Sequence, residues 1–146
     1  MYVDSQLLFS DAQAVTAAAA STNIIDLGPG ASRDIGTGEV LYIVVSVDVA
    51  LTDAGSDSSV TVALEGDSTS TITPDATQDL FVIPALSPAG YVAYAALDPG
   101  SSPLQLRYVQ LRYTPNNGNL STGSFTAFIA KDIQKFKAYA KGYVIS

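Results

Sequence analysis

Carboxylates are the side chains in this sequence best suited to acid–base chemistry, because it contains no histidine and no cysteine. That absence excludes Ser-His-Asp and Cys-His catalysis, together with ordinary zinc and haem sites. Two carboxylate pairs stand out, Glu65 with Asp67 and Asp75 with Asp79. A glycosidase needs two carboxylates that face a sugar cleft, usually beside aromatic platforms. These acids lie in Ser/Thr/Gly-rich stretches and the chain has no tryptophan, so we expect solvated turn residues and no enzyme activity.

Two further patterns resemble ligand-binding loops only superficially. The stretch DAGSDS at residues 53–58 lacks the alternating ligands and terminal glutamate of a hand-type calcium loop. The glycines at positions 28, 30, 36 and 38 do not form a dinucleotide fingerprint, because Arg33 occupies the third glycine position. We therefore interpret these glycines as turn residues and expect neither a metal nor a cofactor.

The length and composition indicate one domain with few charged side chains. Its 146 residues are 47% hydrophobic and only 14% charged, well below the usual quarter. Such a chain tends to hide surface against other subunits, so we expect a homo-oligomer, a homodimer first and a homotrimer as the alternative. The net charge of −7 argues against nucleic-acid binding, which needs a basic footprint. No apolar run approaches the roughly 20 residues that a membrane-spanning helix needs, so we expect no membrane contact.

The middle of the chain has the pattern of short antiparallel strands. One apolar face alternates strictly through Leu41, Ile43, Val45, Val47, Val49 and Leu51. The turn-rich residues 52–58 should close a hairpin onto a strand at 59–65, and a long polar loop should follow. Shorter strands are expected at 80–85 and 90–97.

The last part of this region contains a change of phase. In LQLRYVQLRYT (104–114) the apolar face switches after Tyr108, which indicates a β-bulge or burial of both faces. A turn at 115–119 and a final strand at 123–131 follow. We predict an all-β fold, an antiparallel β-sandwich over residues 29–130.

The first 28 residues are apolar and rich in alanine but do not form a signal peptide. Residues 1–10 contain no basic side chain, and Ser10, Asp11 and Gln13 interrupt the apolar run. A helix over 12–20 and an extended arm remain open, because alanine favours a helix whereas the short length and Val15 oppose it. For the arm we expect Leu7, Leu8 and Phe9 to anchor on a neighbouring subunit.

Residues 131–146 differ from the rest of the chain in charge. They hold four lysines against Asp132, whereas residues 1–130 hold 13 acidic and three basic side chains. This segment is either a solvated end or a contact arm. In the second case its interface residues would be Lys135, Phe136, Lys137, Tyr139 and Tyr143.

The string FSDAQAVT…ASTNIIDLG (9–28) resembles the N-terminus of the jelly-roll cement, or decoration, proteins that staple HK97-like bacteriophage capsids. The resemblance continues more weakly through residues 41–67 and again through 104–134, where it suggests a final hairpin. It implies a jelly roll without a catalytic site, which sits on the outer surface of the virion after assembly in the host cytoplasm. It also implies the major capsid protein as a partner, with Arg107 and Arg112 among the interface anchors.

A second interpretation is a carbohydrate- or receptor-binding sandwich of a phage head fibre or tail. It would be favoured if Tyr91, Tyr94, Tyr108 and Tyr113 formed one open aromatic strip.

Overall fold

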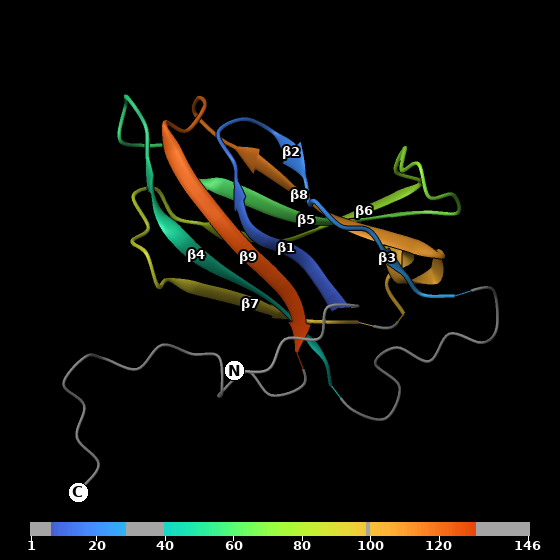
Figure 1. Ribbon diagram of the computed structural model, residues 1–146. Helices are drawn as coiled ribbons and strands as arrows, with labels where there is room; N and C mark the ends of the chain where they lie inside the picture. The colour runs from blue at the N-terminus through green and yellow to red at the C-terminus, as the bar shows by residue number, and fades with distance from the viewer. Residues whose placement is uncertain (1–6, 29–39, 99, 131–146) are drawn as a thin grey trace, which may run out of the picture.

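The structure, a computed structural model, describes residues 7–28, 40–98 and 100–130. Within them the chain is built almost entirely of strands (Figure 1). The strands are β1 (Leu8–Ala14), β2 (Ala19–Ala20), β3 (Ile25–Asp26), β4 (Tyr42–Thr52), β5 (Val60–Asp67), β6 (Ala76–Ile83), β7 (Val92–Ala96), β8 (Tyr108–Pro115) and β9 (Thr122–Ala130), and a short 3-10 helix, η3, covers Ser102–Gln105. No helix in these ranges is long and apolar enough to cross a membrane.

The strands form two antiparallel sheets that pack face to face. Sheet A has the order β1-β9-β4-β7, and sheet B has the order β2-β8-β5-β6, with β3 also paired to β8. Since β2 and β3 both pair with β8, they are two pieces of one interrupted strand. With these two pieces counted as one, the sheets have the strand order of an eight-stranded jelly roll. The predicted all-β sandwich is confirmed, and so is its jelly-roll topology.

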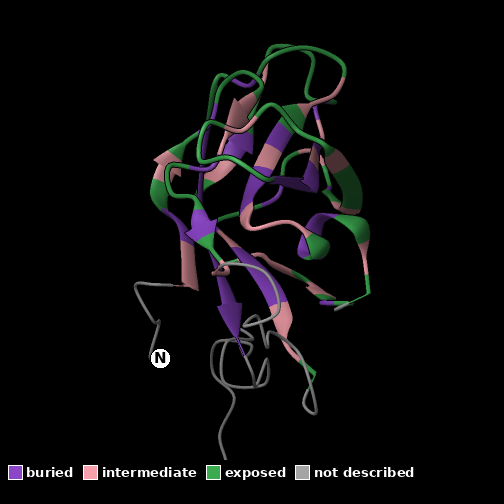
Figure 2. Cartoon of the chain, turned by 90° about the vertical axis from the view of Figure 1, so that its right-hand side faces the viewer, coloured by how far each residue is buried: buried purple, intermediate pink, exposed green. Residues whose placement is uncertain are grey.

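The core lies between the two sheets. Figure 2 shows buried residues along the strands and exposed residues mainly on the loops. The alternating positions of β4, β5, β8 and β9 supply most of the core, and the rings of Tyr113 and Phe125 stack within it at a centroid distance of 5.1 Å. This burial of one face of each sheet is the main source of stability in a fold of this kind.

The N-terminal residues belong to the sandwich and do not form a separate arm. Residues 8–14 form β1, which pairs with β9 of the same chain, and β2 and β3 extend sheet B. The helix considered over 12–20 is absent from the structure; Ala12 has a φ of 47°, which a right-handed helix cannot contain. The domain boundary expected at residue 28 is therefore wrong, because β1 before it belongs to sheet A and β2 and β3 belong to sheet B.

Two expected hairpins are also wrong. Residues 53–59 join β4 of sheet A to β5 of sheet B, and residues 116–121 join β8 of sheet B to β9 of sheet A. β4 is therefore not hydrogen-bonded to β5, and β8 is not hydrogen-bonded to β9. Both connections cross between the sheets at the same end of the sandwich. There the Ser58 hydroxyl donates to the carbonyls of Asn117 and Gly118, which ties the two connections together.

Local irregularities correct two further expectations. Val49, expected to be buried, is 50% exposed, because the register of β4 with β9 shifts on either side of it. The change of phase in residues 104–114 is not a bulge. It marks the point where η3 ends and β8 begins. Leu104 is buried as part of the helix and Val109 as part of the strand, so their side chains do not follow one strand alternation.

Candidate interaction surfaces

The outer face of sheet B contains a nearly buried carboxylate with a partner on each oxygen. Glu65 of β5 lies opposite Gln110 of β8, whose side-chain amide donates to Glu65 Oε2 at 2.7 Å. Arg112, two residues further along β8, donates from Nε to Oε1 at 3.1 Å. The Glu65 side chain is only 8% exposed and that of Arg112 is 35% exposed. Cross-strand pairing thus holds an arginine in a fixed orientation at the surface.

This arrangement leaves part of the Arg112 guanidinium for other contacts. A guanidinium has five N–H donors. Toward the described residues, Arg112 uses only one of them, the Nε–H that bonds Glu65. Its terminal nitrogens can therefore donate to carbonyl or carboxylate groups of a partner. Each oxygen of Glu65 accepts one hydrogen bond, so the nearly buried carboxylate is held from both sides.

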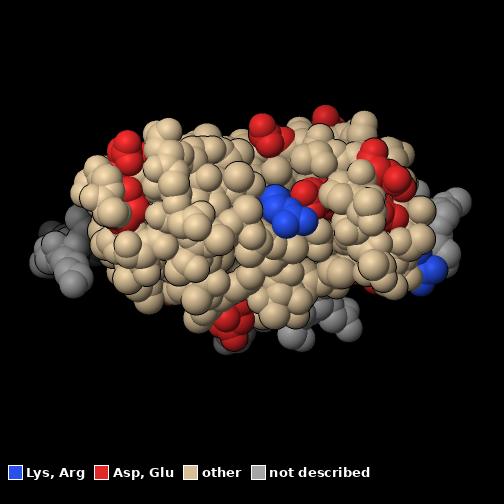
Figure 3. All heavy atoms as spheres, turned by 90° about the horizontal axis from the view of Figure 1, so that it is seen from above, with Lys and Arg blue, Asp and Glu red and all other residues tan. Residues whose placement is uncertain are grey.

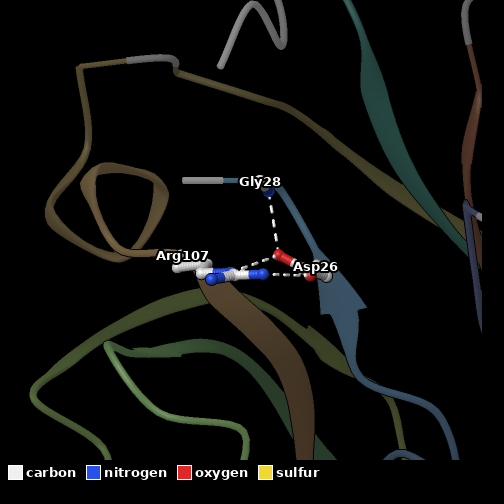
Figure 4. Close-up of polar contacts among 3 residues, drawn as sticks. All are labelled: Asp26, Gly28 and Arg107. Atoms are coloured by element: carbon white, nitrogen blue, oxygen red, sulfur yellow. Dashed lines mark hydrogen bonds and ion pairs between the residues drawn. The ribbon is translucent and has the colours of Figure 1, made fainter. Parts of the chain in front are cut away.

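A second ion pair closes the end of β3 onto the start of β8 (Figure 4). Arg107 donates from Nε and Nη2 to the two oxygens of Asp26, at 2.9 and 3.0 Å, and the Gly28 amide also donates to Asp26 Oδ1. The Arg107 guanidinium also lies over the ring of Tyr108, 5.0 Å from its centroid. The Arg107 hydrogen bond, followed by that from Gly28, lowers the pKa of the Asp26 carboxyl, and the same bond to Asp26 raises the pKa of Arg107. Arg107 is thus engaged within its own chain.

The remaining acidic loops are closed by backbone hydrogen bonds. Asp67 accepts N–H bonds from Thr69 and Thr73, and the Thr69 bond contributes most to lowering its pKa. Desolvation alone would raise the pKa of Asp53, but the N–H bonds that it accepts from Ser58, Asp57 and Gly55 together outweigh this and lower it. The loops at 53–58 and 67–73 are thus self-capped turns. In the ranges that the structure describes, no group of acidic residues is placed to hold a metal ion.

Comparison with known proteins adds one decisive match. A family model named Bbp16 matches residues 9–129, from β1 to β9. The chain belongs to the Bbp16 family. It is therefore a phage-related protein, in partial agreement with the resemblance seen in the sequence. No curated protein matches the chain.

The expected N-terminal anchors of this Bbp16 family member have three different environments. Phe9 is fully buried in the core, so it cannot anchor on a neighbouring subunit, and that expectation is wrong. Leu7 is half-buried against the same core. Leu8 is half-buried on the opposite side, on the outer face of sheet A. Among these three, Leu8 is the one that lies on the outer face of a sheet.

The other expected interface residues divide in a similar way. Arg112 projects from sheet B as described, and Arg107 is paired with Asp26. Lys135, Phe136, Lys137, Tyr139 and Tyr143 lie outside the described residues. Sequence reasoning missed Gln110 and took Glu65 and Asp67 for solvated turn residues. Both carboxylates are buried, whereas Asp75 and Asp79 are exposed as expected.

The tyrosine strip required by the receptor-binding interpretation does not form. Tyr113 lies in the core between the sheets, with no exposed surface. Tyr94 belongs to β7 of sheet A and Tyr108 to β8 of sheet B, so they lie in different sheets. The structure therefore removes the feature that would have favoured a glycan-binding platform.

The Bbp16 family member carries little positive charge on the described surface. Figure 3 shows a broad uncharged face with acidic groups mostly near its rim and one basic group close to its middle. Arg107 and Arg112 are the only basic residues in the described ranges. This surface offers no basic footprint for a phosphate backbone.

Proposed function

We propose that the chain is a structural virion protein: a cement, or decoration, protein that binds the outer surface of an icosahedral phage head. There it would stabilise contacts between major capsid proteins, without catalysis, cofactor, nucleic acid or membrane. It would act as a homo-oligomer, a dimer in the simplest case, and would join the head in the host cytoplasm. A phage-related family and a jelly-roll fold support this role.

The observation that carries the proposal is the position of the N-terminal string in the fold. FSDAQAVT…ASTNIIDLG is the part of the sequence that most specifically resembles the cement proteins. It forms β1 in sheet A and β2 and β3 in sheet B, so it builds an edge of each sheet. The resemblance therefore concerns the sandwich itself, and the family match spans the same strands.

The outer face of sheet B offers one fixed arginine to a partner. On it, Arg112 presents its terminal nitrogens from a position held by the nearly buried Glu65. An arginine held in advance loses little conformational entropy on binding, and arginines of this kind are frequent anchors in interfaces. We propose Arg112 as one anchor toward the major capsid protein.

The direct test is co-sedimentation of the purified chain with phage heads assembled without it. We expect saturable binding to the heads, and binding that Arg112→Met weakens at least tenfold. Arg107→Met is the matched control, because it removes the same charge from an arginine whose Nε and Nη2 both bond Asp26, and it should have little effect. Absence of binding by the unaltered chain would overturn the proposed function, whereas equal effects of the two variants would remove only Arg112 as an anchor.

The oligomeric state is tested separately by light scattering at micromolar concentration. A mass of twice 15.1 kDa is expected for the homodimer, and three times that mass would support the trimer. A monomer of 15.1 kDa would contradict self-association in free solution.

A further inference from the structure

A second hydrophobic cluster lies on the outer face of sheet A, away from the core between the sheets. We call it the outer cluster. Its members are Leu8, Tyr42, Val44, Val92, Phe128 and Ala130. Val44 and Phe128 lie opposite each other on β4 and β9, and each is only 1% exposed. Tyr42 makes an edge-to-face contact with Tyr94 at the border of the cluster.

The near-complete burial of Val44 and Phe128 requires a cover. All members of the outer cluster come from β1, β4, β7 and β9, the four strands of a single sheet. No hydrophobic residue of sheet B or of a described loop belongs to it. Neighbours within one sheet face shield a side chain from the sides, but the top of that face stays open to water unless another segment packs on it.

We propose that residues 131–146 of the same chain pack over the outer cluster. Ala130 is both the end of β9 and a member of the cluster, so this segment begins at the surface it would cover. Fully extended, 16 residues reach roughly 50 Å. The distance from β9 across β4 to β7 is about 10 Å, two strand spacings. The segment is thus long enough to cross the face.

The composition of the segment suits this position. Phe136, Tyr139 and Tyr143 supply aromatic area, and Val144 and Ile145 add aliphatic area. Lysines are interspersed with these residues, and a lysine stem can lie along an apolar surface while its ammonium group stays in water. The apolar side chains would meet the outer cluster, and the lysines would give an acidic protein one basic face.

Two other stretches of the chain are less suited to cover the cluster. Residues 1–6 precede Leu8 and contain a single aromatic residue, Tyr2. Residues 29–39 precede Val40 and contain Ile35 as their one large hydrophobic residue. Neither matches the aromatic content of residues 131–146. This inference does not depend on the capsid role, because it concerns contacts within one chain.

A single tryptophan tests the proposal in the full-length chain. The sequence has no tryptophan, so Phe136→Trp introduces a unique reporter. We expect its emission to be shifted to the blue, as for a buried indole, and to be unchanged on dilution. In this background Val92→Lys, which places a charge at the edge of the outer cluster, should move the emission to the red.

Val82→Lys is the matched control. It makes the same change on β6, the edge strand of sheet B, at a side chain that is 53% exposed, and it should leave the emission blue. Should Val92→Lys unfold the protein, Val92→Thr takes its place as a milder polar change, and it should give a smaller red shift. Red emission from the parent reporter, or equal responses to the two lysine variants, would overturn the proposal. Blue emission that turns red on dilution would also overturn it, because the segment would then be packing on a second copy.

Discussion

Ser10 of β1 and Tyr113 of β8 share a buried hydrogen bond between their hydroxyls, 2.8 Å long, although the two strands belong to different sheets. Ser10 also donates to the Gln13 side chain, which in turn bonds the backbone of Ala20 in β2. The polar network therefore crosses the sandwich at the edge formed by the N-terminal residues. Since a buried polar group without a partner is costly, this network fixes β1 in one position.

Phe9 should contribute to folding, whereas its neighbour Leu8 should matter much less. We expect Phe9→Ala to lower the free energy of unfolding by about 3–5 kcal/mol, because it opens a cavity in a fully buried site. Leu8→Ala should cost less, since that side chain is only half-buried. Urea unfolding followed by circular dichroism measures both. Similar small costs for the two variants would indicate that β1 is peripheral after all.

Tyr113 should make the protein sensitive to alkaline pH. Burial raises the pKa of its hydroxyl, and the Ser10 hydrogen bond only partly opposes this. The neutral form is favoured by the fold, so the stabilising effect is complete below the ordinary tyrosine pKa of about 10 and is lost as pH rises above it. Tyr113→Phe should flatten this loss and cost about 1 kcal/mol at neutral pH. Tyr108→Phe is the control; an unchanged alkaline slope in Tyr113→Phe would contradict the assignment.

The two arginines should differ in their effect on stability. Arg112→Met leaves the nearly buried Glu65 with Gln110 alone, so we expect a loss of about 2 kcal/mol. Adding Glu65→Gln to Arg112→Met removes the unpaired charge and should restore part of that loss. Arg107→Met breaks an exposed pair and should cost clearly less than Arg112→Met. Thermal unfolding of these variants decides; no recovery in the double variant would refute the role given to Glu65.

Acid should destabilise the fold through Asp67 and Asp26. Both have a lowered pKa in the folded chain, Asp67 chiefly through the Thr69 amide and Asp26 chiefly through Arg107. A lowered pKa gives stability that is present above the unfolded value, about 3.9, and is lost as pH falls below it. Asp67→Asn should therefore show a smaller loss on acidification than the unaltered chain, while Asp75→Asn, at an exposed position, should show the same loss. Parallel acid transitions in all three would count against this explanation.

The sequence pattern predicted strands more reliably than their partners. The alternation of Ile43, Val45 and Val47 follows from one buried face and is visible in the chain itself. Which strand lies beside β4 depends on contacts distant in sequence, so the polar turns at 53–59 and 116–121 looked like hairpins although they cross between sheets. The exposure of Val49 has the same origin, because a register shift is set by the neighbouring strand.

The candidate interface was predictable only in part. Arg112 could be named from the sequence, but its fixation by Glu65 and Gln110 depends on cross-strand pairing of β5 with β8. Phe9 was misplaced because an apolar residue near the start of a chain looks the same whether it packs inside its own domain or on a partner. A strand signal in FSDAQA is weak, since β1 is irregular and its register with β9 shifts twice.

The central claim, binding to the outside of a phage head, is tested most directly by electron cryomicroscopy of heads assembled without this chain and then saturated with it. We predict additional density on the outer surface, at boundaries between major capsid proteins, into which the two-sheet jelly roll fits. Heads whose outer surface is unchanged by the chain, or density found on the tail alone, would contradict the account.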